Sequence, residues 1–210
     1  MSDLRSHWEG VYSSKNSADQ SWHQPHLRQS LELFSKTQIS QDDHIIDIGG
    51  GASTFADDLL DRGYRNVTVV DISPHALEIS KKRLAERAHN VEWIAGDILE
   101  ITLPKNRCQF WHDRAVFHFL IDAIDRKNYV EQVRHAMKPG GFVLLATFSI
   151  NGPQKCSGLE VCRYTPERML KEFGDEFQLT ESRAETHTTP AGKTQAFIYC
   201  LMRFTATPAL

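Results

Sequence analysis

The stretch Ile45-Ile46-Asp47-Ile48-Gly49-Gly50-Gly51 decides the fold of this chain, because a β-branched run passes directly into a glycine triplet. β-branched residues favour a strand, and glycines permit a tight turn in which backbone N–H groups can approach a bound group closely. A helical pattern follows over about residues 53–62, and the N-terminus of a helix favours a negative charge. The stretch therefore predicts the first strand, turn and helix of a parallel α/β sheet.

The same alternation of strand and helix continues along the chain. Further strands are expected over residues 67–71, 91–95, around 110–111 and over 142–148, with helices over about 73–87 and 125–137. Two later runs, 178–183 and 195–204, are expected to pair antiparallel and close the sheet. The pattern predicts an α/β fold, a three-layer α/β/α sandwich with a Rossmann-like, mostly parallel seven-stranded sheet and an antiparallel last strand.

Length and composition indicate one domain. The 210 residues fit a single core, divided into an N-terminal helical segment (1–43), a central core (44–148) and a long loop with closing strands (149–210). The net charge of −3, without long blocks of one sign, argues against nucleic acid or a membrane surface as the main partner. No signal segment or long apolar run is present, so we expect a cytoplasmic protein. Nothing in the sequence specifies an oligomeric state.

The four cysteines form no C-x-x-C pair, so the sequence predicts neither a zinc cluster nor a disulfide framework. No metal site is expected.

Two carboxylates near the glycine turn indicate the kind of ligand. Asp71 ends the second strand, 20 residues after Gly51, where an acidic residue binds two ribose hydroxyls. A nicotinamide-dependent dehydrogenase is the obvious rival, but Thr54 replaces the third glycine of its fingerprint. Asp47, directly below the turn, would repel a pyrophosphate and suits an ammonium group. A cationic, phosphate-free nucleoside is the better ligand.

These residues carry a resemblance to the class I methyltransferases that depend on S-adenosylmethionine (SAM). It covers about residues 44–148, with matching pieces in family order at 46–51, 70–73, 96–98, 111–114 and 137–141. Gly50 departs from the pattern, since many members have cysteine there, but this position contributes mainly backbone. The resemblance implies a SAM-binding core with residues 1–43 as its lid.

The resemblance also implies individual cofactor contacts. They are Asp47 with the backbone of Gly49 and Gly51 for the methionine part, Asp71 for the ribose hydroxyls, Ile72 against the adenine face, Asp97 for the adenine amino group and the backbone N–H of Ile98 for the ring. The alternatives are that Asp97 only caps a helix and that Asp71 is only a carboxylate at a strand end.

Three aromatic residues precede the core. Trp8 and Tyr12 are four apart on an expected helix, and with Trp22 they resemble the aromatic lid that related methyltransferases fold over SAM. A sulfonium beside aromatic faces gains roughly 0.5 to 2 kcal/mol of cation–π energy. The alternative is ordinary packing of an N-terminal helix.

The end of the fourth strand holds the densest set of catalytic candidates, His112, Asp113 and His118. Asp113 occupies the family position that faces the transferring methyl group. His118 follows in the next turn, and its imidazole would suit a general base near neutral pH. The alternative for His118 is a hydrogen-bonded core histidine. Arg163 and Tyr164 in the loop over 151–164, and His187 before the final turn, are second-rank candidates.

Three hypotheses for the acceptor remain. A small thiol or sulfide fits the absence of a large substrate domain and the apolar residues around His118. A protein lysine is the second, because residues 63–67 and Asp113-Arg114 resemble small lysine methyltransferases. The third is a SAM-binding module without catalytic activity. A closed apolar cavity would favour the thiol, and an acidic docking surface would favour the lysine.

Overall fold

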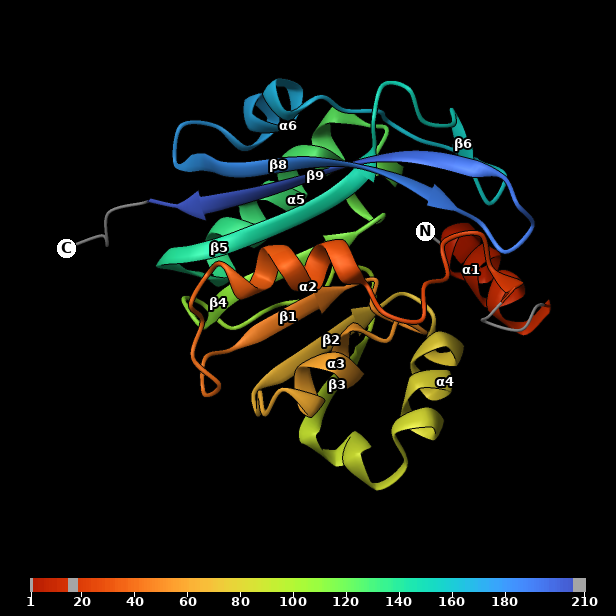
Figure 1. Ribbon diagram of the computed structural model, residues 1–210, viewed down its shortest axis with the longest axis horizontal. Helices are drawn as coiled ribbons and strands as arrows, with labels where there is room; N and C mark the ends of the chain where they lie inside the picture. The colour runs from red at the N-terminus through yellow and green to blue at the C-terminus, as the bar shows by residue number, and fades with distance from the viewer. Residues whose placement is uncertain (1, 15–18, 206–210) are drawn as a thin grey trace.

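A computed structural model describes residues 2–14 and 19–205, with side chains from residue 4 onward (Figure 1). Residues 1, 15–18 and 206–210, which belong to the predicted lid and closing segments, lie outside the described residues. The main sheet consists of β1 (Ile45–Ile48), β2 (Val67–Asp71), β3 (Val91–Ala95), β4 (Cys108–Arg114), β5 (Met137–Phe148), β8 (Phe177–Thr188) and β9 (Thr194–Phe204). The α-helices are α1 (Ser2–Ser14), α2 (Arg28–Ser35), α3 (Phe55–Asp61), α4 (Pro74–Leu84), α5 (Ala123–Ala136) and α6 (Pro166–Phe173).

The seven strands are arranged in the order β3-β2-β1-β4-β5-β9-β8. Neighbouring strands from β3 to β5 run parallel, and β9 pairs antiparallel with both β5 and β8. The predicted fold class is thus confirmed. Because the chain moves outward from β1 to β3 and then returns to place β4 on the other side of β1, the strand order reverses at β1 and β4. A ligand of an open α/β sheet binds at such a reversal.

Residues that alternate along β1 pack on opposite faces of the sheet. Ile45 belongs to a core with Leu33 and Phe34 of α2, whereas Ile46 belongs to a second core with Tyr129 and Val133 of α5. Figure 1 shows α2 in front of the central strands and α5 behind them. The two buried cores account for the three layers.

Local sequence signals set the helix starts. The Ser73 side chain accepts a hydrogen bond from Ala76 N at the start of α4, and Thr165 does the same for Arg168 N at the start of α6, each before a proline. The helix expected to run to about Arg87 ends at Leu84 instead, and η2 (Ala85–Asn90) continues it as a 3-10 helix.

Several boundaries differ from the sequence prediction. The residues expected to separate helix from strand at 138–141 are part of β5, whose pairing with β4 shifts register between Cys108 and Phe110, and Gly140 in this irregular stretch has a φ of +83°. The loop over 149–164 contains an unpredicted hairpin, β6 (Lys155–Cys156) and β7 (Leu159–Glu160). Its two turn residues, Ser157 and Gly158, both have positive φ, as a tight hairpin turn requires. Among the described residues, every helix is too short or too polar to cross a bilayer.

Candidate active site

A cavity of about 450 Å³ lies at the carboxyl ends of β1, β2 and β4. In Figure 1, β1 and β2 point toward α1, which lies beside these strand ends. Most of the predicted cofactor residues line this cavity, namely Trp8, Tyr12, Trp22, Gly49, Asp71, Ile72, Asp97 and Ile98. The sequence interpretation and the geometry therefore converge on one site.

The glycine turn after β1 leaves no room for side chains. Gly49 has a φ of +66°, and a Cβ atom there would lie 2.1 Å from Cγ2 of Val116. A Cβ atom at Gly51 would lie 2.4 Å from Oδ2 of Asp71. Gly49 lines the cavity, while Gly51 does not. The turn thus exposes backbone to the cavity at Gly49, and Gly51 serves the contact with Asp71.

Asp71 is held by the backbone around it. Its Oδ2 accepts from Gly51 N at 2.9 Å, and its Oδ1 accepts from Ser73 N at 2.8 Å. Burial raises the pKa of this carboxyl to about 7, although the two backbone hydrogen bonds act in the opposite direction. Asp71 therefore lines the cavity as an oriented carboxylate that titrates near neutral pH.

The neighbouring strand end supplies Asp97 and Ile98. Oδ1 of Asp97 accepts from Leu99 N at 2.9 Å, so this side chain does stabilise a local turn, as the alternative interpretation held. Asp97 also lines the cavity, as do Ile98 and Leu99. The turn-stabilising role and the predicted adenine contact are compatible because the contact with Leu99 N uses only Oδ1.

Asp47 and His112 lie behind the glycine turn and do not line the cavity. Nδ1 of His112 lies 2.6 Å from Oδ1 of Asp47, and its Nε2 lies 2.8 Å from the Ser30 hydroxyl. The imidazole stacks on Phe55 with 4.1 Å between ring centroids. His112 is thus a buried partner of Asp47, and its expected position at the acceptor is wrong because its strand position directs it to the α2 and α3 side of the sheet.

The three aromatic residues of the predicted lid line the cavity and contact one another. The Trp8 ring lies 5.8 Å from Trp22 and 5.1 Å from Phe119, and Tyr12 lies 6.1 Å from Trp22, between centroids. The helix is attached through Glu9, which accepts hydrogen bonds from the Ser73 hydroxyl at 2.6 Å and from His75 N at 3.2 Å. Helix α1 is therefore tied to the N-terminus of α4.

Asp113 and His118 do not reach the cavity, contrary to the sequence expectation. Both Asp113 oxygens face the protein: Oδ1 accepts from Val116 N at 2.8 Å, and Oδ2 accepts from Phe117 N at 3.0 Å and from the Tyr129 hydroxyl at 2.5 Å. Burial raises the pKa of Asp113 to about 6. This carboxylate shapes the loop after β4.

His118 is fully buried behind the cavity wall. Its Nδ1 accepts from Phe148 N at 3.3 Å, and its ring packs 4.8 Å from that of Phe148. Burial lowers the pKa of His118 to about 3. An imidazole in this position matches the core-histidine alternative, because so acidic a conjugate acid makes a weak base at neutral pH.

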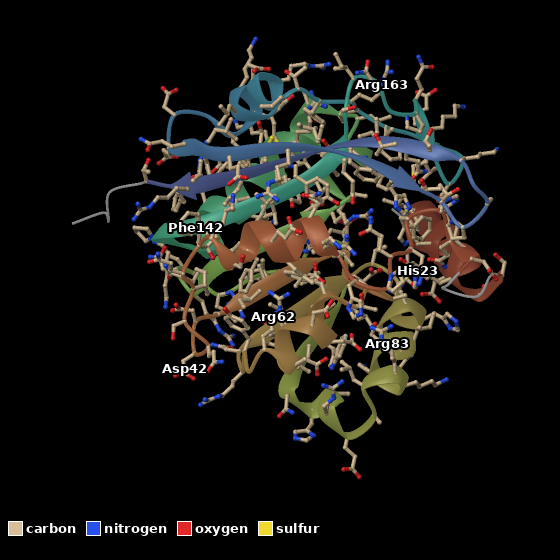
Figure 2. The ribbon with its side chains drawn as sticks, in the orientation of Figure 1. His23, Asp42, Arg62, Arg83, Phe142 and Arg163 are labelled. Atoms are coloured by element: carbon tan, nitrogen blue, oxygen red, sulfur yellow. The ribbon has the colours of Figure 1, made fainter. Side chains whose placement is uncertain are left out.

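The three second-rank candidates also lie outside the cavity lining. Nη1 of Arg163 donates to Ile150 O at 2.9 Å, and Figure 2 places Arg163 at the outer edge of the molecule. Tyr164 is 1 % exposed and packs against Phe117. His187 donates from Nε2 to Ser21 O at 2.8 Å and thereby positions the segment that carries Trp22. Each supports a loop near the site.

The sequence interpretation missed the residues at the other end of the cavity. This end, which we call the β4–β9 end, is lined by Arg114, Phe119, Phe148, Cys156, Gln195 and Phe197. Arg114 stands in segment 111–114, which carries part of the family resemblance. That segment was the sequence signal that could have identified it as a site residue. Gln195 and Phe197 alternate along the last strand with no local feature that marks them.

Comparisons with known proteins show what this chain is similar to. A family model described as "Methyltransferase domain" matches residues 45–141. Human EEF1A lysine methyltransferase 2 is 25 % identical over 191 residues, which cover 84 % of this chain and 75 % of that protein. A SAM-dependent methyltransferase from Anabaena variabilis superposes with a TM-score of 0.72 at 17 % identity, over 96 % of this chain and 95 % of that one. Another from Methanosarcina mazei gives 0.70 at 17 % identity, over 83 % and 98 %.

Proposed function

This chain belongs to the class I SAM-dependent methyltransferase superfamily, and on that premise we propose that its methyl acceptor is a small thiol or sulfide. The chain is thus a SAM-dependent enzyme, and the proposal concerns its acceptor and the roles of individual residues. A single feature of the cavity carries it, the chemical difference between its two ends.

The cavity residues at the carboxyl ends of β1, β2 and β3 fit SAM. Asp71 would accept from the ribose hydroxyls, Ile72 and Ile98 would enclose the adenine, and Asp97 would accept from its amino group. The exposed backbone at Gly49 would receive the methionine part, with the charge of Asp47 behind it favouring the ammonium group. The aromatic rings of Trp8, Tyr12 and Trp22 suit a sulfonium. SAM supplies an electrophilic methyl carbon that needs an aligned nucleophile and exclusion of water.

The β4–β9 end suits an acceptor that loses its proton without a general base from the protein. Its lining is largely aromatic and, among the described residues, includes no aspartate, glutamate or histidine. Burial raises the pKa of its one thiol, Cys156, to about 11, so this group is a weak candidate for a base. A free thiol has a pKa of about 8.5, whereas a lysine ammonium has a pKa of about 10.4. A thiol therefore supplies a reactive thiolate near neutral pH where no base is at hand.

A protein lysine is the second candidate. It is favoured by the similarity to EEF1A lysine methyltransferase 2 and by acidic lining residues, Glu100 and Asp125, outside the β4–β9 end. The positive charge of Arg114 within that end opposes a lysine ammonium. All four cysteines are free, which suits the reducing cytoplasm in which we propose that the enzyme works.

The decisive experiment follows the labelled methyl group. Purified protein is incubated with methyl-labelled SAM and, separately, with a panel of small thiols and sulfide or with cell lysate. We expect label in the small-molecule fraction with a rate that rises with pH toward the thiol pKa. Label confined to protein lysines would replace the thiol proposal with the lysine one. Binding of SAM without transfer to any fraction would favour a module without catalytic activity.

A further inference from the structure

Arg114 follows Asp113 at the end of β4 but points across the sheet. Its Nε donates to the Tyr199 hydroxyl at 3.1 Å, and its guanidinium lies 4.7 Å from the centroid of Phe197, both on β9. Its Nη1 donates to Trp22 O at 3.0 Å. Three contacts, two with β9 and one with the backbone of Trp22, hold this guanidinium in one orientation.

One nitrogen of this guanidinium has no hydrogen-bond partner among the described residues. Nη2 of Arg114 is buried without a hydrogen-bond partner among residues 4–14 and 19–205, and no carboxylate of those residues forms a salt bridge with Arg114. The nearest acid in the network, Glu185, is separated from it by the Tyr199 hydroxyl, which donates to Glu185 at 2.7 Å. A buried guanidinium N–H without an acceptor is costly, and a guanidinium fork suits a carboxylate.

A second unsatisfied polar group lines the same end of the cavity. Gln195 is 9 % exposed, and its Oε1 has no hydrogen-bond partner among the described residues. The oxygen and nitrogen of a glutamine amide exchange places by a simple flip, so this group can present an N–H donor as well. Arg114 and Gln195 together supply two uncommitted polar groups in an otherwise aromatic wall.

We propose that Arg114, assisted by Gln195, forms a subsite for a carboxylate carried by the methyl acceptor. The inference deepens the proposed function, on which it rests, by narrowing the acceptor to a small thiol that bears a carboxylate. The carboxylate would receive N–H groups from both side chains while the thiol end extends toward the cofactor.

The position of the subsite separates it from the cofactor's own carboxylate. The guanidinium contacts the side chains of Phe197 and Tyr199 of β9, which lies on the far side of β5 from β4. Arg114 itself belongs to β4, the neighbour of β1, so these contacts direct its side chain away from β1 and the glycine turn. The acceptor, which must approach from the side opposite the nucleoside, is the better source of the anion.

Equilibrium binding tests this subsite without relying on turnover. The full-length protein saturated with S-adenosylhomocysteine (SAH) is titrated with 3-mercaptopropionate and with 2-mercaptoethanol, which has a thiol but no carboxylate. Arg114→Gln should weaken 3-mercaptopropionate binding by about tenfold or more and leave 2-mercaptoethanol unchanged. The affinity of Arg114→Lys for 3-mercaptopropionate should lie between those of the wild type and Arg114→Gln, because the point charge of an ammonium replaces the forked guanidinium. Arg203→Gln is the matched control, since Arg203 also lies over a phenylalanine ring, 5.8 Å from Phe142, outside the cavity lining.

The cofactor arm uses SAH and 5′-methylthioadenosine, which lacks the amino-acid part. Unchanged dissociation constants for both with Arg114→Gln support the proposal and show that the variant is folded. Weaker SAH with unchanged methylthioadenosine would overturn it in favour of the cofactor carboxylate. Weaker binding of both SAH and methylthioadenosine would mean that Arg114 only fixes the segment of Trp22, and would overturn the proposal. Binding of 3-mercaptopropionate that is unchanged in Arg114→Gln would also overturn it. Arg114-dependent carboxylate binding without methylation of any thiol would support the subsite and reject the thiol acceptor.

Discussion

The carboxylate of Asp71 accepts a hydrogen bond from the backbone N–H of Gly51 at 2.9 Å, across 20 residues of sequence. This contact joins the glycine turn after β1 to the acidic end of β2. A side chain at position 51 would collide with the same carboxylate oxygen. The glycine and the aspartate are therefore one unit, so the glycine turn and the end of β2 are positioned together.

The first prediction follows from the pKa of Asp71, which burial raises to about 7. If the ionised form accepts from the ribose hydroxyls, SAH affinity should be highest above pH 7 and fall by up to about tenfold per pH unit below it, because binding must then release a proton. Asp71→Asn should weaken SAH by about 1.5 to 3 kcal/mol and remove most of this pH dependence. Calorimetry between pH 5.5 and 8.5 measures both effects. A flat wild-type profile would show that Asp71 does not bind the ribose in ionised form.

The second prediction is that His118→Ala impairs folding rather than chemistry. The buried ring packs against Phe148 and lies behind the cavity wall, so its removal leaves a void and should lower the free energy of unfolding by about 2 to 4 kcal/mol. At a temperature where the variant is folded, kcat with the acceptor found in the labelling experiment should stay within about threefold of wild type. A loss of about 10² or more in kcat with intact SAH binding would restore His118 as the general base.

The third prediction concerns acid stability and the same histidine. The pKa of His118 is about 3 in the folded protein, against about 6.5 for a solvated imidazole, so the unfolded chain binds more protons below pH 6.5. Stability should therefore fall as the pH drops from 6.5 toward 3. His118→Phe, which cannot titrate, should show a shallower loss in denaturant titrations over this range. Equal slopes for the two proteins would mean that His118 is protonated without penalty in the folded state.

The fourth prediction separates two residues that share one hydrogen bond. Asp113→Ala removes the acceptor of two backbone N–H groups and of the Tyr129 hydroxyl, leaving three buried donors unpaired. It should destabilise the protein by several times the effect of Tyr129→Phe, for which about 1 to 3 kcal/mol is expected. Thermal unfolding compares them. A stable Asp113→Ala variant that binds SAH normally but has lost turnover would point to a direct role at the acceptor.

The fifth prediction uses the charge difference between SAM and SAH. Only SAM carries a sulfonium, so Trp8→Ala should weaken SAM by about 0.5 to 2 kcal/mol more than it weakens SAH. Trp8→Phe is the matched control, because it keeps an aromatic face beside Trp22 and Phe119. Paired calorimetric titrations give the difference. Equal losses for both ligands would mean that Trp8 contributes packing alone.

The strand and helix order, the glycine turn and the place of Asp71 at the end of β2 were predicted from sequence, whereas the hydrogen bond between Gly51 N and Asp71 was not. Each is a local signal: β-branched runs, capping residues such as Ser73 and a characteristic spacing between turn and acid. Trp8 and Tyr12, which lie one helical turn apart on α1, line the cavity, and their role as a lid over the cofactor stays a prediction. The predicted strand boundaries were less accurate around Gly140 and Ser157. Both residues have a positive φ, which changes the path of the backbone there.

The sequence by itself determined the fold, the cofactor and the position of the glycine turn beside the acidic end of β2, since those depend on contacts within consecutive βα units. Only the tertiary structure decided which side chains at the end of β4 and after it line the cavity. Ala115 has a φ of +73°, and the chain turns there so that Asp113 and His118 are buried while Arg114 lines the cavity. Gln195 and Phe197 arrive through the antiparallel pairing of β9 with β5, about 80 residues further along. Side-chain direction at a strand end depends on that register and turn, and no local pattern in the sequence records either.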